Sequence, residues 1–393
     1  MATNKKSATS KTHAKPIAAS RHSNGAAKPE TKPEAKSLAA VKPNTEKEKM
    51  AIPTLASTPA SALPPNSKTS DKKGMRVTKG TAKVEAAPLP KADAKLEKNL
   101  AASSTGALQS PLRIFQIYKE AWQRDLLDRS FIALDNMKIN SEMQDFEVLR
   151  QLEKSDYILG AKLWGALSWR FTERTGMTGA DLIKSIESNP GFDVYYCNPA
   201  PQTEGLFHNL WLHGETAHPQ FLALSQALFK TLGLPEQYLT SIVPSEHFAT
   251  ANYFIGTPKF WAAYIPWIIT LFNTANKKLP PAIRDLMHSK TADPRDKEAT
   301  YVPFLIERLF PIFLMTAGKN LKTFKIALPK PEAALNVHLK LLREMKDVAV
   351  KTKSAWLAAC WVNYRNLYLT QVNGKEWCLK YLRQITPTDI KFL

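Results

Sequence analysis

The segment "FHNLWLHGETAHP", residues 207–219, contains three histidines and a glutamate, side chains that commonly bind metal ions or transfer protons. His208, His213 and His218 are spaced by five residues. On an α-helix this spacing turns each side chain about 140° from the previous one, so the three cannot share one helical face. In a loop they could converge, and Glu215 could join them as a ligand.

Three interpretations of this segment stay open. Metal-binding helices use pairs at i, i+3 or i+4, and no recognisable zinc signature is present, so no metal ligand is predicted. His213, Glu215 and His218 could instead line a site through hydrogen bonds, with Glu215 and His218 as candidate catalytic groups and His213 as a candidate substrate-binding group. The third interpretation is an ordinary structural turn.

A second candidate segment is "FDVYYCNPAP", residues 192–201, a β-branched and aromatic strand that enters a Pro-rich turn. Enzymes of the α/β class place functional loops at such strand ends. Asp193 is a candidate catalytic carboxylate, and the alternative is a solvated or capped side chain at the start of the strand. Asn198 lies at the outgoing end of the strand and is a candidate substrate-binding residue.

A third segment, "LLDRSFIALDNMKIN", residues 126–140, is predicted to be a loop. Carboxylate and amide groups of this kind can hold a metal ion or sugar hydroxyls, and Asp135 and Asn136 are candidate substrate-binding residues. The alternative is that Asp128, Asp135 and Asn136 form turns through hydrogen bonds to their own backbone. Walker, GxGxxG, GxSxG and HExxH motifs are absent from the sequence, which argues against the common nucleotide-binding, hydrolase and protease signatures.

These segments must be positioned by regular elements. Alternating or β-branched patterns predict strands, and apolar residues at helical spacing predict helices. The strands are expected within residues 113–118, 162–171, 192–197 and 250–256, and the helices within 141–154, 177–191, 218–233 and 258–272. From Pro303 onward the sequence predicts helices alone.

Strands that alternate with helices and then give way to a helical run indicate an α/β core with a helical C-terminal layer. Such cores often bind ligands at the carboxyl ends of their strands. Within the helical run, the stripe Trp356, Cys360 and Tyr364 is predicted to belong to the core.

The composition divides the chain into two parts. The first hundred residues hold 20 Lys or Arg and 8 Asp or Glu, a net +12, and no aromatic residue precedes Phe115. A segment this poor in hydrophobes cannot offset its backbone ordering entropy, so residues 1–110 are predicted to be a disordered Lys/Ala/Pro-rich tail. Residues 111–393 are predicted to be the folded domain.

The basic tail is expected to attract nucleic acid or another polyanion, such as an acidic membrane surface, without sequence preference, because it lacks aromatic residues for base stacking. A solubilising linker is the alternative. Cys197, Cys360 and Cys378 have no CxxC partners and are predicted to be buried, unreactive thiols in a reducing compartment. With no secretory signal expected and no apolar run long enough for a transmembrane segment, a soluble cytoplasmic protein is expected.

The order of the segments resembles that of uncharacterised bacterial glycosyltransferase-like domains associated with surface-polysaccharide biosynthesis. The similarity covers about residues 112–275, and its motifs are moderately specific. It is carried by "RIFQIYKEA", "FIALDN", "WGALSWRFTERTGMTGADLIKSI", "FDVYYCNPAP", "LWLHGETAHP" and "ANYFIGTPKFW".

The resemblance implies a GT-A-like (Rossmann-like) mixed sheet and a function in binding or transferring a sugar from a nucleotide-activated donor to a glycan acceptor. It places Asp193, Glu215 and His218 in catalysis and adds Asn252, beside the fourth strand, to the substrate-binding set. Many GT-A enzymes hold a divalent metal with an Asp-any-Asp triplet, and this sequence has none. Donor binding is therefore expected to rely on Arg, Lys or His, or catalysis has been lost. The alternative function is a non-catalytic scaffold or binding protein.

Overall fold

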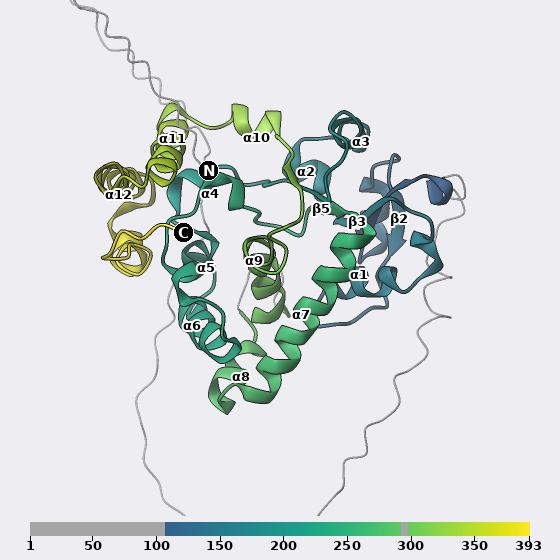
Figure 1. The fold of residues 1–393 in the computed structure, drawn as a ribbon, viewed down its shortest axis with the longest axis horizontal. Coiled ribbons are helices and arrows are strands. Elements are labelled where there is room, and N and C mark those ends of the chain that lie inside the picture. The colour runs from purple at the N-terminus through teal and green to yellow at the C-terminus, as the bar shows by residue number, and fades with distance from the viewer. Residues whose placement is uncertain (1–106, 292–297) are drawn as a thin grey trace, which may run out of the picture. The chain divides into compact units, whose positions relative to one another are not determined.

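Six strands form one mixed sheet in the computed structural model, which describes residues 107–291 and 298–393 (Figure 1). The predicted tail, residues 1–110, lies outside the described residues except for its last four. The strands follow the order β2-β1-β3-β5-β4-β6 across the sheet. All neighbours pair in parallel except β5, which is antiparallel to both β3 and β4. The predicted α/β core with a mixed sheet is confirmed.

Four strands lie where the sequence predicts them, and two do not. The strands are β1 Leu112–Tyr118, β2 Ile132–Asp135, β3 Leu163–Ser168, β4 Val194–Tyr196, β5 Phe254–Gly256 and β6 Thr323–Lys325. The loop predicted across residues 126–140 contains β2, and the segment predicted to be wholly helical contains β6. Both are edge strands, β2 among turn-forming residues and β6 among helices, and these surroundings determined the prediction.

Side chains alternate between two apolar layers on opposite faces of the sheet. Phe115 and Ile117 of β1 enter the larger cluster, which also contains Trp164, whereas Ile114 and Leu167 enter the smaller one. Figure 1 shows α7 and α1 on one side of the strands and α2 and α3 on the other. The sheet is therefore covered on both faces, as a largely parallel sheet requires.

The helices before β6 are α1 Asp145–Glu153, α2 Phe171–Thr175, α3 Gly179–Glu187, α4 Gln202–Leu206, α5 Leu210–Ala217, α6 Phe221–Leu232, α7 Pro258–Lys278, α8 Pro281–Met287 and α9 Tyr301–Met315. After β6 come α10 Pro329–Ala333, α11 Val337–Thr352 and α12 Ala355–Trp377, which continues as a short π-helix to Leu382. Thr178 and Thr257 cap α3 and α7, and Gly233 ends α6 at a φ of 66°. None of the described helices is both long and apolar enough to cross a membrane.

The C-terminal hairpin of α11 and α12 packs on α4 and buries two cations beneath it. Lys346 and Arg365 are each 0% exposed. Burial lowers the pKa of Lys346 to about 7, and its ammonium group donates to the Phe207 carbonyl at 3.4 Å. Burial also lowers the pKa of His208 well below its ordinary value, so its neutral ring accepts a hydrogen bond from Arg365 at 3.0 Å.

The predicted core stripe on α12 is wrong. Trp356 is 87% exposed and Cys360 is also exposed, because α12 buries the opposite side of the helix, including Trp361 and Arg365. The prediction of three buried thiols therefore holds for Cys197 and fails for Cys360. Helical periodicity correctly grouped Trp356 and Cys360 on one face of α12, but this face points to solvent and not into the core.

The contact between β3 and β5 predicts the effect of Gly165→Ala. A Cβ atom at this position would lie 2.5 Å from the Phe254 carbonyl oxygen, in the backbone of the neighbouring strand. We expect the substitution to lower the free energy of unfolding by about 1–3 kcal/mol through overpacking, measured by urea denaturation. An unchanged midpoint and slope would contradict this account of the strand spacing.

The buried ammonium of Lys346 predicts a pH dependence of stability. The unfolded chain keeps this lysine protonated up to about pH 10, whereas the folded pKa is about 7. Between these values the unfolded state binds more protons, so folding stability should rise with pH by up to about 1.4 kcal/mol per unit. Below pH 7 both states are protonated and this slope vanishes. Lys346→Met should remove the Lys346 contribution to the rise, as measured by denaturation from pH 6 to 9.5; parallel curves for the two proteins would refute it.

Candidate functional site

Four of the predicted substrate-binding residues lie along one edge of the sheet. Because five strands are parallel, their carboxyl ends share this edge, and antiparallel β5 contributes its amino end. Asp135 ends β2 and Asn136 follows it, Asn198 lies two residues after β4, and Asn252 lies two residues before β5. We call this line of residues the carboxyl edge. It is the position at which open α/β sheets bind ligands.

The switch point of the sheet lies between β1 and β3, since the chain passes from β1 to β2 on one side and to β3 on the other. Gln116 of β1 is fully buried there. Its amide nitrogen donates to the carbonyls of Ser168 and Trp169, both at 3.3 Å, and its amide oxygen accepts from the Asp128 N–H at 2.8 Å. Gln116 therefore holds together the loops that follow β1 and β3. The only signal in the sequence is a polar residue inside an apolar strand.

An aromatic pair lies on these two loops. Trp122 is 53% exposed, and its ring centroid lies 5.1 Å from that of Trp169 in a T-shaped arrangement. The Arg170 guanidinium lies 5.7 Å from the Trp169 ring and forms an ion pair with Glu173. Exposed indoles stack on bases and sugar rings, and a guanidinium binds phosphate. These three residues, Trp122, Trp169 and Arg170, were not among the sequence candidates.

Next to the aromatic pair, Asp135 and Asn136 follow β2. Burial and the neighbouring Asp135 carboxylate raise the pKa of the Tyr118 phenol above its ordinary value. Asp135 also accepts the Met137 N–H at 2.9 Å, the Asx turn that the sequence left as an alternative. Asn136 is only 4% exposed, and its Oδ1 finds no hydrogen-bond partner within residues 107–291 and 298–393. An unmet buried acceptor of this kind lowers the folding stability by about 1–3 kcal/mol.

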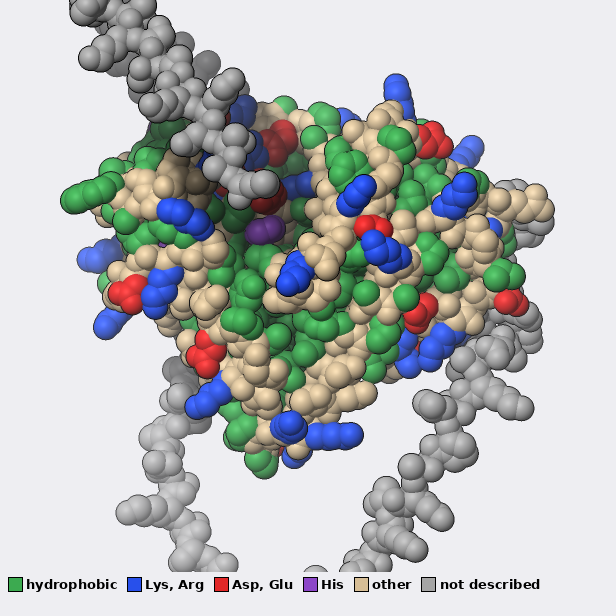
Figure 2. Space-filling model, viewed as in Figure 1, with side chains coloured by type: hydrophobic (Ala, Val, Ile, Leu, Met, Phe, Trp, Pro, Cys, Tyr) green, Lys and Arg blue, Asp and Glu red, His purple; other side chains and the backbone are tan. Residues whose placement is uncertain are grey.

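The other half of the carboxyl edge is a charged network around Glu204 of α4. Glu204 is 3% exposed and accepts from Lys325 at 2.6 Å, from Asn198 at 2.7 Å and from Arg343 at 3.4 Å. Asn198 also accepts from the Thr250 hydroxyl at 2.7 Å. Figure 2 shows a hollow between the positions of α4, α9 and α10 in which acidic, basic and histidine side chains are visible.

The structure does not bring Asp193, Glu215 and His218 to the carboxyl edge. Asp193 precedes β4, at the opposite edge, about 16 Å along the chain from Asn198. It accepts from the Lys322 N–H at 2.9 Å and from the Lys259 ammonium at 3.1 Å. Burial acts to raise the pKa of Asp193, but these two donors together lower it below its ordinary value, which makes the carboxylate a weak base.

The histidine segment is a helix, α5, and not a loop. Glu215 accepts the Leu222 N–H at 2.6 Å, and burial raises the pKa of its carboxyl group. His218 follows the last turn and is 2% exposed, with its ring 3.9 Å from that of Phe304. His213 packs against Phe207 at 4.8 Å between ring centroids. Nowhere in the described part of the chain do three or more His, Cys, Asp or Glu residues form a group that could hold a metal ion.

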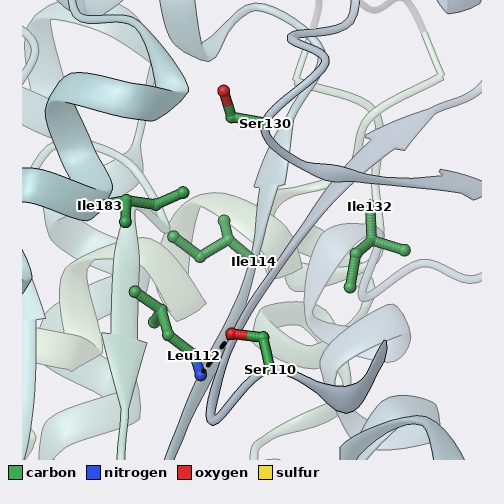
Figure 3. Close-up of a pocket in the computed structure, with 6 residues that line it drawn as sticks. All are labelled: Ser110, Leu112, Ile114, Ser130, Ile132 and Ile183. Atoms are coloured by element: carbon green, nitrogen blue, oxygen red, sulfur yellow. Dashed lines mark hydrogen bonds between the residues drawn. The ribbon is translucent and has the colours of Figure 1, made fainter. Parts of the chain in front are cut away.

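A cavity of about 180 Å³ lies near the amino ends of β1 and β2, lined by Ser110, Leu112, Ile114, Ser130, Ile132 and Ile183 (Figure 3). It contains none of the predicted residues and is smaller than the roughly 300 Å³ of a typical ligand pocket. Asn252, at the carboxyl edge, has an amide Oδ1 with no partner among the residues described, as Asn136 does.

No family model, curated protein or solved structure matched the chain when it was compared with known proteins.

The buried carboxylate of Glu204 predicts the effect of Glu204→Gln. The amide would keep an acceptor for Asn198 but would leave Lys325 without its carboxylate partner and Arg343 with Glu332 alone. We expect the free energy of unfolding to fall by about 1–3 kcal/mol. Glu332→Gln is the matched control, because Glu332 pairs with the same Arg343 but its side chain is 34% exposed, so less than about 1 kcal/mol is expected. Equal losses of the free energy of unfolding in the two variants would contradict the prediction that the buried carboxylate of Glu204 stabilises this network more than Glu332 does.

Proposed function

We propose that this protein binds a nucleotide-activated sugar along the carboxyl edge of its sheet, as a GT-A-like, glycosyltransferase-like protein of bacterial surface-glycan synthesis acting in the cytoplasm. The observation that carries the proposal is the Trp122–Trp169 pair, with Trp122 exposed and Trp169 half-buried, beside Arg170 at the switch point of the sheet. The mixed α/β sheet and the order of the segments that resemble such domains support it. No comparison with a known protein contributes to it.

Each part of such a donor has a chemical counterpart at this edge. The indoles of Trp122 and Trp169 offer faces for the base or the sugar ring. Arg170 offers a guanidinium group to the diphosphate. In the structure its N–H groups donate to the Glu173 carboxylate, whose place the diphosphate would take.

Sugar transfer also needs a group that accepts the proton of the acceptor hydroxyl. Asp193 and Glu215 lie away from this edge, so within the proposal Asp135, next to Tyr118 and Asn136, takes that role. Arg170 neutralises charge on the leaving diphosphate in the way that a metal ion does in many GT-A enzymes. The proposal therefore predicts donor binding without added divalent metal.

Donor binding is tested by titrating a panel of nucleotide sugars against the full chain, with EDTA present, and following the melting temperature. At least one donor should raise it, and Trp122→Ala should weaken that donor's affinity by about ten-fold, since stacking on one aromatic side chain is worth about 1–3 kcal/mol. Trp356→Ala is the control, because Trp356 is also exposed, at 87% against 53% for Trp122, but lies on α12. No shift with any donor, or equal effects of the two substitutions, would count against the proposal.

A second candidate function is polyanion binding by the tail, as part of a non-catalytic scaffold. The net charge of +12 over the first hundred residues favours it. Removing residues 1–106 should abolish the salt-sensitive retention of the protein on immobilised DNA, and DNAs of different sequence should behave alike. Retention on DNA that survives the deletion would refute this second function. The same result would not bear on the proposed donor site.

A further inference from the structure

We propose that the outer face of the α11–α12 hairpin docks on an anionic membrane surface. Eleven large hydrophobic side chains are exposed among the described residues, and seven of them lie between Val337 and Leu379. Such clustering is unusual, since exposed hydrophobes on soluble domains are normally scattered.

Five of the seven form one stripe on each helix, and Val372 and Leu379 lie outside these stripes. Val337, Leu341 and Val348 follow one another on α11 at intervals of four and seven residues. Trp356, Cys360 and Leu367 repeat these intervals on α12. Such spacing keeps each stripe within about 40° around its helix and extends it over about 16 Å. We call the two stripes together the hairpin face.

Both stripes point away from the protein. The buried residues lie on the other side of each helix, more than a quarter turn from the middle of its stripe. They are Leu342, Lys346, Ala349 and Val350 on α11 and Ala358, Trp361, Arg365 and Leu369 on α12.

The helices are joined along their length. Asn336 donates to the Tyr368 hydroxyl at 3.0 Å, and the His338 ring contacts that of Tyr368 at 5.9 Å. Figure 2 shows hydrophobic side chains projecting where Figure 1 places α12.

The surrounding charge identifies the occupant. Between Val337 and Leu382 five lysines are exposed, Lys340, Lys351, Lys353, Lys375 and Lys380, against two glutamates, Glu344 and Glu376. A helical surface with an exposed Trp, aliphatic side chains and lysines is the composition that binds at the interface of anionic lipids. A second copy of the chain is disfavoured, because a two-fold contact through this face would bring like charges together.

The test measures co-sedimentation of the full chain with vesicles of phosphatidylcholine containing 30% phosphatidylglycerol, with vesicles of phosphatidylcholine alone for comparison. We expect clear binding to the anionic vesicles and weak binding to the neutral ones. The double variant Trp356→Ala/Leu367→Ser should bind the anionic vesicles about ten-fold more weakly or less, because it removes two apolar side chains from the contact. The tail is the same in both proteins, so the difference reports on the hairpin face.

Two controls separate this inference from its alternatives. Leu159→Ser removes another exposed apolar side chain, 75% exposed between α1 and β3, and should leave vesicle binding unchanged. Trp122→Ala should also bind vesicles normally while losing donor affinity, so failure of the docking proposal is distinguishable from failure of the proposed function.

Equal vesicle binding by the wild type and the double variant would overturn the proposal. A dimer in solution that the double variant dissociates, detected by light scattering, would overturn it in favour of self-association. Unchanged melting temperatures are expected for all the variants, since each altered side chain is exposed.

Discussion

The insertion of one antiparallel strand between parallel neighbours is the constraint on which the rest of the structure depends. Strand β5 lies between β3 and β4, and glycines stand at two of its contact points. A side chain at Gly165 would meet the β5 backbone, and one at Gly256 would meet the Phe260 ring at 2.2 Å. The space is used by Trp164 and Trp261, whose rings stack at 4.3 Å while Trp261 donates to the Trp164 carbonyl at 2.9 Å. This packing fixes how the two halves of the sheet meet.

One consequence of the reversed strand is the division of the carboxyl edge into two chemically different halves. Near β1 and β3 the edge is aromatic, with Trp122 exposed and Trp169 half-buried. Near β4 and β6 it is charged and largely buried, with Glu204 and Lys325. The amino end of β5 separates them, and Tyr253 there bonds to the Ser168 hydroxyl at 2.9 Å. A nucleotide sugar likewise has two chemically different parts, rings that stack on aromatic side chains and a charged diphosphate. The aromatic half fits such a ligand better, because Trp122 is exposed there for stacking whereas Glu204 of the charged half is buried.

The sequence predicted the parts of the fold that local patterns encode. The strands at β1, β3, β4 and β5 and the caps at Thr178, Thr257 and Gly233 follow from side-chain alternation and capping chemistry, which act over a few residues. Strand β2 was missed because Asp128, Asp135 and Asn136 beside it are turn-forming residues, and these residues determined the prediction of a loop. Strand β6 was missed because it stands among helices and pairs with β4, which lies far away in the sequence.

The candidate site was predicted less completely, for a related reason. Asp135, Asn136, Asn198 and Asn252 share an edge because they flank strand ends, which the sequence showed. Glu215 and His218 lie elsewhere because α5 is a helix that buries them, and their spacing alone could not decide between a helix and a loop. Trp122 and Trp169 are 47 residues apart in the chain, and only the pairing of β1 with β3 brings them together.

Helix α11 links the charged half of the carboxyl edge to the hairpin face. Arg343 points toward Glu204 and Glu332, at 3.4 and 2.7 Å, and Lys346 is buried one turn further along. A helix can turn about its axis only if these cations leave their partners, so the network fixes which side of α11 faces outward. The polar contacts on the inner side therefore keep Val337, Leu341 and Val348 exposed, although burying those side chains would be favourable by the hydrophobic effect alone. The same argument applies to α12, where Arg365 bonds inward to His208 and Trp356 is left in solvent. The exposure of the hairpin face thus follows from specific buried polar contacts and not from a shortage of apolar surface to cover it.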